Sequence, residues 1–328
     1  MNRRDTLVAL LALGAAASPR VAIPQTSLRT PKIGFLGSFA SPLQDAWGRT
    51  LKELGWIEGK NVLVDRLYAE GNPDRLPALA ADLVRKQVDV IYTQGPEATV
   101  AAALATKTIP IVFWGPAYPV EQGLVDSLAR PGGNVTGVAW NSAVVKQLEF
   151  VKEISPRAKR VAHFLLPTAM RTLSGEPFTG LMSQVESTGK SMGFEMKSFQ
   201  VIKQEDFDGA FKAIKAWGAQ ALITYSTPPT ILARQQIVSF ANVNRIPSFF
   251  DWRGFAEAGG LFSYGPLILE MTVQAVRQLD RILRGARPAD LPVELPTRYE
   301  FVINQKTATS LGIKVPQTLL ARADEVIR

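Results

Sequence analysis

The sequence predicts an α/β protein made of two doubly wound, Rossmann-like lobes that are joined by a multi-strand hinge. The chain has 328 residues, which exceeds a typical single domain and favours two compact units. From residue 31 onward, short β-branched runs alternate with amphipathic stretches, a pattern typical of strand–helix–strand units around a parallel sheet. The alternation occurs in two successive series, one for each lobe.

The first series covers residues 32–140. The apolar run KIGFL predicts a buried strand, and the helical spacing that follows ends at Gly55. In the second helix of the series, apolar side chains recur on one face. Strands are predicted at 32–36, 61–67, 88–92, 109–114 and 135–140. Helices are predicted at 43–54, 73–86 and 97–105.

The second series begins after Asn141, and a shorter tail follows it. Strands are predicted at 160–166, 194–201, 221–224 and 246–249, and helices at 144–154, 177–192, 207–217 and 229–242. The tail is expected to form a strand at 261–264, a helix at 266–283, a strand at 299–303 and a terminal helical stretch. Because these tail elements cannot complete one lobe without leaving strands unpaired, we expect further crossings between the lobes. The first lobe is predicted at 31–140 plus 262–295, and the second at 141–261 plus 296–328.

An export leader is predicted at residues 1–22. Arg3 and Arg4 precede an apolar run and then small residues, which is the order of a secretory signal peptide, although a buried N-terminal helix is the alternative. The run is too short for a permanent membrane helix, which needs about 20 apolar residues. The sequence has no cysteine, so it offers no site for a lipoprotein anchor. We expect a free periplasmic protein, exported by the Sec or the twin-arginine route.

Charge and motifs exclude several classes of function. The net charge of +8 is spread without a basic run or an aromatic-basic stripe, so nucleic acid is not an expected partner. His163 is the only histidine and lies in an apolar strand, which leaves almost no residues for a zinc site or a Ser-His-Asp triad. The sequence contains no phosphate-loop, dinucleotide or nucleophile-elbow motif. We expect no enzyme activity, no metal and no cofactor.

The candidate binding site is a cleft between the lobes, because open α/β sheets bind ligands at the carboxyl ends of their strands. Loops at these ends carry function while the scaffold sets their positions. Solute contacts to both lobes would favour a closed arrangement over an open one. The strand-to-helix loops that we expect to face the cleft are 37–41, 94–98, 115–120, 167–170, 226–230 and 250–254.

Aromatic residues near the strand ends are the sharpest indication of the ligand. Rigid rings suit planar or apolar solutes, so several rings in one group of loops favour an aromatic or partly apolar solute. Core packing is the commoner role for any single ring. The rings expected to line the cleft are Phe39, Trp114, Tyr118, Trp140 and Trp252.

Polar and small residues complete the set of candidates. Asp251 can pair with a ligand ammonium and Arg253 with a ligand carboxylate, with surface solvation as an equal alternative. Tyr264 is expected at a crossover, as part of the hinge or of the ligand wall. For Ser38 and Gly95, turn formation is an equally good account. The remaining ligand-binding candidates are Ser38, Gln94, Gly95, Pro116, Ala117, Thr168 and Thr227.

Several stretches carry a family resemblance. They are YAEGNPDRLPALAADLV at 68–84 with VDVI at 88–91, GLVDSLARPGGNVTG at 123–137, and the tail with PADLPV at 288–293, VIN at 302–304 and ARADEVI at 321–327. In this order and spacing they resemble the ABC-transporter substrate-binding family that includes tryptophan- and tyrosine-binding importers. The resemblance implies a type I periplasmic-binding-protein fold, a small solute held by loops of both lobes, and a membrane permease with its ATPase as partner. We expect the protein to act as a monomer.

Two other functions remain open on the same fold. One is a carboxylate-dependent hydrolase, which turnover of a bound compound would reveal. The other is a ligand sensor or regulatory module. Sugar-responsive repressors with this fold carry a DNA-binding helix-turn-helix before the lobes, whereas here the predicted leader takes that place.

Overall fold

Two β-sheets organise the chain. A computed structural model of the protein describes residues 29–41, 43–141, 143–165, 172–176 and 180–328. Within it, Pro31–Arg328 form one compact unit that contains both sheets. The predicted α/β class is therefore confirmed, whereas the predicted leader at 1–22 lies outside the described residues.

The first sheet has five parallel strands in the order β2-β1-β3-β4-β5. The strands are β1 (Lys32–Gly37), β2 (Leu63–Tyr68), β3 (Val90–Gln94), β4 (Ile111–Ala117) and β5 (Val135–Trp140). Its central strands are buried on both faces, which explains their nearly continuous apolar runs. Apolar side chains of α1 (Leu43–Glu53) and α10 (Ile268–Leu283) cover one face, and those of α2 (Leu76–Arg85) and α3 (Pro96–Ala105) cover the other.

The second sheet has seven strands in the order β12-β11-β10-β9-β8-β6-β7. They are β6 (Arg160–Leu165), β7 (Glu195–Gln200), β8 (Ala221–Thr224), β9 (Ser248–Phe250), β10 (Phe262–Pro266), β11 (Tyr299–Asn304) and β12 (Glu325–Ile327). All neighbouring strands pair in parallel except β10 and β11. The antiparallel pair arises because the chain leaves this sheet after β10 and returns at β11.

Helices cover both faces of the second sheet as well. One face packs against α4 (Val144–Ile154), α5 (Gly180–Ser191), α11 (Gln305–Leu311) and α12 (Gln317–Leu320). The other packs against α6 (Phe207–Trp217), α8 (Arg234–Val243) and α9 (Arg253–Glu257). A short helix, α7 (Pro228–Leu232), follows β8. The predicted helix at 229–242 is thus two helices, which meet at Ala233.

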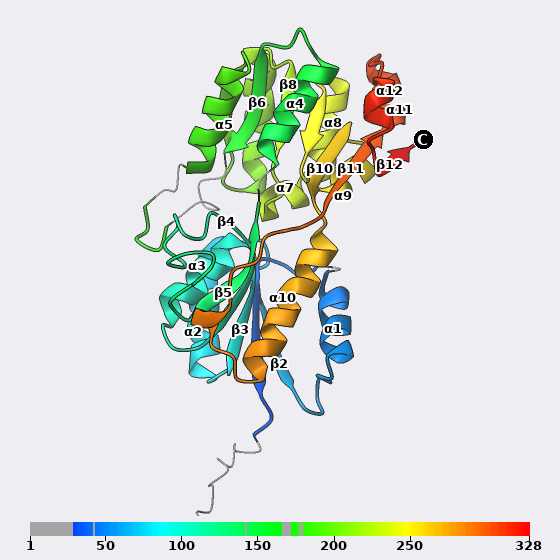
Figure 1. The fold of residues 1–328 in the computed structure, drawn as a ribbon. Helices are drawn as coiled ribbons and strands as arrows, with labels where there is room; N and C mark the ends of the chain where they lie inside the picture. The colour runs from blue at the N-terminus through cyan, green and yellow to red at the C-terminus, as the bar shows by residue number, and fades with distance from the viewer. Residues whose placement is uncertain (1–28, 42, 142, 166–171, 177–179) are drawn as a thin grey trace, which may run out of the picture. The chain divides into compact units, whose positions relative to one another are not determined.

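The chain crosses between the two sheets at three places in the described residues. The first crossing follows β5, the second follows β10, and the third lies between the short 3-10 helix η4 (Pro288–Asp290) and β11. After the second crossing, α10 (orange) lies beside α1 (blue) on the first sheet (Figure 1). Near the third, Glu294 forms a bridge with Val138 of β5. The expected recrossing of the tail is therefore confirmed.

The predicted boundary of the first lobe was wrong at one point. Residues 262–266 were assigned to that lobe, but they form β10, which pairs with β9 and β11 in the second sheet. The helix that follows, α10, is the first part of this segment to pack on the first sheet. The crossing therefore comes after Pro266, because β10 fills the position between β9 and β11 and pairs with the edges of both strands that face each other.

Candidate ligand-binding site

A cavity of about 480 Å³ is lined by residues at the carboxyl ends of strands from both sheets. Residues at or just after β1, β3, β4 and β5 line it from the first sheet, and residues at or just after β6, β8 and β9 line it from the second. This volume lies within the range of small-molecule sites, about 300 to 1,000 Å³. The topology thus produces the cleft predicted for open α/β sheets.

Two glycines shape the first-sheet side of the cavity. Gly95 begins α3 with φ 98°, and Gly115 in β4 has φ 110°, both of which favour glycine. A Cβ on Gly115 would stand 3.6 Å from the Cα of Gly95, and the Gly95 N–H donates to the Trp114 carbonyl over 2.9 Å. The two backbones therefore approach closely where they line the cavity.

Four aromatic residues line the same side. Trp114 and Trp140 meet edge to face, with ring centroids 6.3 Å apart. The indole Nε1 of Trp114 is buried and has no hydrogen-bond partner among the described residues. Tyr118 has φ 57°, an unusual conformation for a non-glycine residue, and its hydroxyl donates to Gln184 of α5. Phe39 also lines the cavity.

Asp251 is the buried acid of the second-sheet side. It follows β9 and is only 2% exposed. Its Oδ1 accepts hydrogen bonds from the Ser226 N–H over 2.8 Å and from the Ser226 hydroxyl. Burial raises the pKa of Asp251 to about 6, while the bonds from Ser226 act in the opposite direction. The carboxyl group is therefore ionised near pH 7 but gains a proton in mild acid.

Tyr225 lies beside this acid. Its side chain is 8% exposed, and its hydroxyl is buried with no hydrogen-bond partner among the described residues. Burial, followed by the nearby charge of Asp251, raises its pKa, so the hydroxyl stays protonated. The backbone of this segment is fixed, because the Thr230 hydroxyl donates to the Tyr225 carbonyl over 2.6 Å. A buried hydroxyl without a partner is available to a ligand in the cavity.

Gly265 of β10 packs directly against the backbone of Asp251. A Cβ added at Gly265 would overlap the carbonyl oxygen of Asp251 and would stand 2.6 Å from its carbonyl carbon. Only a residue without a side chain leaves room for the backbone after β9 to approach β10 this closely. The location of the acid therefore depends on a glycine of the neighbouring strand.

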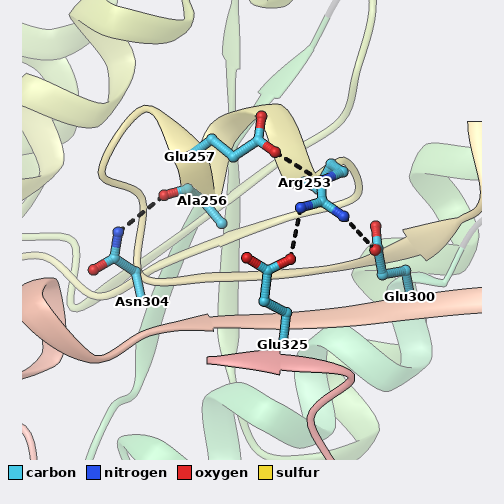
Figure 2. Close-up of polar contacts among 6 residues, drawn as sticks. All are labelled: Arg253, Ala256, Glu257, Glu300, Asn304 and Glu325. Atoms are coloured by element: carbon cyan, nitrogen blue, oxygen red, sulfur yellow. Dashed lines mark hydrogen bonds and ion pairs between the residues drawn. The ribbon is translucent and has the colours of Figure 1, made fainter. Parts of the chain in front are cut away.

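Arg253 has a structural role in place of the predicted contact with a ligand. Its Nε donates to Glu257 over 2.7 Å, its Nη1 to Glu300 over 2.5 Å, and its Nη2 to Glu325 over 2.6 Å (Figure 2). The guanidinium group thus connects α9, β11 and β12. Next to this cluster, the Asn304 side chain donates to the Ala256 carbonyl over 3.0 Å. Arg253 does not line the cavity, because its donors point toward these glutamates.

Loops of the two sheets contact each other at two lining residues of the cavity, Gln122 and Leu232. The Leu173 N–H donates to the Gln122 carbonyl over 2.9 Å, and the Leu173 side chain packs on the first-sheet core although it follows β6. On another side, a Cβ at Gly71 would stand 3.5 Å from the side chain of Leu232 in α7. These contacts join loops of the first sheet to loops of the second.

The structure brings most of the predicted site residues together. The predicted residues that line the cavity are Ser38, Phe39, Gln94, Gly95, Trp114, Ala117, Tyr118, Trp140, Thr227, Asp251 and Trp252. Pro116 does not line it; this proline is buried between Gly115 and Ala117, since successive strand residues point in opposite directions. Tyr264 does not line it either, because it packs in the second-sheet core, stacked on Tyr299 at 5.7 Å. Thr168 lies outside the described residues.

Other lining residues were not among the predicted ligand contacts. Ser226 and Pro228 lie in a loop that was expected to face the cleft, but neither was singled out there. Gln122 and Arg234 lie outside the loops that were expected to face the cleft. The remaining ones are Ala40, Ser41, Leu43, Pro96, Gly115, Phe164, Tyr225, Ile231, Leu232 and Ile268. For Tyr225, the signal was its place directly after a short apolar strand, at the end of the sheet that faces the cleft.

Comparison with known proteins identifies the family. The model of the ABC transporter substrate binding protein family matches residues 43–327. The chain belongs to this family. A relative, the tyrosine-binding protein of Clostridioides difficile strain R20291, is 27% identical over 270 residues, which cover 81% of this chain and 75% of the relative. The predicted function as a substrate-binding protein of an ABC transporter is thus confirmed.

Solved structures of similar proteins show the same fold. A conserved domain protein from Vibrio cholerae has a TM-score of 0.83 and 29% sequence identity, and the match covers 91% of this chain and 100% of that one. An ABC domain from Streptococcus pneumoniae, solved in complex with L-Trp, has a TM-score of 0.82 at 24% identity, with the same coverage. This substrate-binding protein has the predicted type I periplasmic-binding-protein fold. None of its described helices combines the length and apolarity that a bilayer crossing requires.

Proposed function

We propose that this protein captures an aromatic solute of the amino-acid type in the cavity between its two sheets and delivers it to an ABC permease with its ATPase. The observation that carries the proposal is the combination of rings from both sheets with one buried carboxyl group, Asp251. Rings bind planar groups, and a buried acid binds a cationic group. The name of the Clostridioides difficile relative, a tyrosine-binding protein, supports the same class of solute.

The proposed mechanism is a shift in population between open and closed arrangements. The two lobes consist of 31–140 with 267–295, and of 141–266 with 296–328. Residues of both line the cavity, so a solute that contacts both favours closure. The permease then binds the closed form. The protein works as a monomer in the periplasm after removal of its leader, makes no contact with nucleic acid and leaves its solute chemically unchanged.

Isothermal titration calorimetry tests this function. We expect tyrosine, tryptophan or phenylalanine to bind with micromolar or tighter affinity, and leucine and glucose to bind at least about tenfold more weakly, because stacking on the rings favours planar groups. Chromatography of the mixture after a long incubation should return the solute intact. Binding of none of the three aromatic amino acids, or conversion of the bound solute, would contradict the proposal.

A further inference from the structure

The charges around the cavity are unequal on its two sides. Of the described residues that line it, only Asp251 and Arg234 are charged. Asp251 is almost fully buried, whereas Arg234 is exposed at the start of α8, and its Nη1 donates to the Ile231 carbonyl over 3.1 Å. An exposed cation is screened by water and contributes little to binding, while a buried acid acts at a lower dielectric. The interior of the cavity therefore favours a cation.

The start of α3, on the first-sheet side, does not provide a site for the carboxylate of a solute. Gly95 caps α3 without a side-chain hydrogen bond, and Pro96, the next residue, has no N–H to offer an anion. The carboxyl group of Glu97 accepts a hydrogen bond from its own backbone N–H, and its Oε2 is buried without a partner among the described residues. That Oε2 would stand 3.7 Å from a Cβ on Gly95, a cavity-lining residue. The start of α3 therefore offers a ligand carboxylate no N–H from Pro96, and the buried side chain beside it is an acid, not a basic group.

Groups that suit an amine gather on the opposite side. Oδ1 of Asp251 is held by two hydrogen bonds from Ser226, so the carboxylate has a fixed orientation. The buried Tyr225 hydroxyl beside it can accept a hydrogen bond from an ammonium group. The ring of Tyr225 and, from the first-sheet side, that of Tyr118 both line the cavity and can offer cation–π contacts.

We infer that the group recognised in the solute is a protonated amine, bound by Asp251 and the Tyr225 hydroxyl, and that a carboxylate is not required. Aromatic amines without a carboxylate are therefore ligands of this cavity. The inference rests on the proposed function and narrows its class of solute. The inference concerns only the charged end of the solute. The rings of the first-sheet side are expected to contact the aromatic end of an amine and of an amino acid alike.

Two sets of compounds with matched rings test the inference. Calorimetry near pH 7 compares tyrosine, tyramine and 3-(4-hydroxyphenyl)propionate, and then tryptophan, tryptamine and indole-3-propionate. In the set whose ring fits, we expect the amine to bind within about threefold of the amino acid, and the acid to bind about a hundredfold more weakly, because it leaves Asp251 buried without a partner. An amino acid that binds while its amine does not would overturn the inference and leave the proposed function intact. Failure of all six compounds and of phenylalanine would contradict the proposed function itself.

Three variants locate the effect. Asp251→Asn keeps an oxygen that accepts the bonds from Ser226, and it should weaken the amine and the amino acid alike by about a hundredfold. Asp208→Asn is the matched control and should change neither by more than about twofold, because its carboxylate is exposed on α6 and does not line the cavity. Arg234→Gln removes the exposed cation at the cavity. A loss of tyrosine or tryptophan binding in Arg234→Gln, with amine binding retained, would show that the carboxylate is needed and would overturn the inference. Thermal melts of all three variants confirm folding.

Discussion

The first-sheet side of the cavity carries no charge among its described lining residues, whereas the second-sheet side carries both Asp251 and Arg234. Rings and closely approaching glycine backbones make up much of the first side, including Trp114, Trp140 and Gly95. On the second side, Asp251 and Tyr225 place a carboxylate next to a hydroxyl that has no partner among the described residues. Charge selection thus comes from the second sheet, while rings of both sheets contribute to shape selection, so a solute that contacts the rings of the first sheet and Asp251 must contact both sheets.

The largest effect is expected at Gly265, which contacts the backbone of Asp251 and so affects only the charged, second-sheet side of the cavity. Gly265→Ala places a methyl group on the carbonyl of Asp251, so we expect the free energy of unfolding to fall by about 3 kcal/mol. Urea unfolding measures the change. The control is Gly209→Ala in α6, where an added Cβ has no neighbour within 4 Å and a gain of about 0.5 to 1 kcal/mol is expected. Equal stability of the two variants would show that the backbone after β9 is free to move.

A second test concerns the free-energy cost of burying the ionised carboxylate of Asp251. Its folded-state pKa of about 6 lies above the ordinary aspartate value of 3.8, so the folded state binds more protons between these values and stability falls as pH rises through them. The ionised acid then costs the ligand-free protein about 3 kcal/mol above pH 6. Asp251→Asn should therefore unfold at higher urea concentration than the natural protein near pH 7. This advantage should vanish near pH 4, and an advantage that persists there would have another cause.

The ring side is tested by Trp114→Ala. Loss of a buried indole face should weaken the binding of an aromatic amine by about thirtyfold, or about 2 kcal/mol. The preference for the amine over the matched acid should remain, because Asp251 is untouched. Trp56→Ala is a control, since Trp56 donates to Asp280 and does not line the cavity. If Trp114→Ala removed the preference for the amine as well, shape and charge would not be separable.

The smallest expected effect is the pH dependence of binding. A cationic ligand requires the ionised form of Asp251, so its affinity should fall as pH drops through about 6. Between pH 7.5 and pH 5 the dissociation constant should rise about tenfold, since one proton competes with the ligand. Calorimetry at several pH values measures this change, and the weak residual binding of Asp251→Asn should show no such dependence. A flat profile for the natural protein would place the cationic group elsewhere.

Most of the fold and much of the cavity could be predicted from the sequence, because periodicity determines where parallel strands end. The loops after β1, β3, β4, β8 and β9 were expected to face the cleft, and lining residues come from all of them. Boundaries depend on contacts between distant elements and were less accurate. β10 was placed in the wrong lobe, because the pattern of a five-residue strand does not indicate which strand it pairs with. The three-residue β12 was not predicted for the same reason.

Side-chain direction was the harder part of the site. Pro116 lies between two lining residues but does not line the cavity itself. The register of β4 and β5 shifts between Trp114 and Ala117, and the sequence does not indicate this irregularity. Arg253 was expected to contact a ligand, but Glu300 and Glu325, which are 47 and 72 residues away in the chain, take its donors. Tyr225 and Gln122 contribute through buried polar atoms, and burial follows from tertiary packing rather than from local pattern.

The Arg253 cluster has a practical consequence for work with this protein. Through a single guanidinium group, the last strand of the chain is attached to the helix that directly follows Trp252 in the cavity wall. A truncation that removes β12 and Glu325 would therefore leave the Nη2 donor of Arg253 without its partner, directly behind the cavity wall.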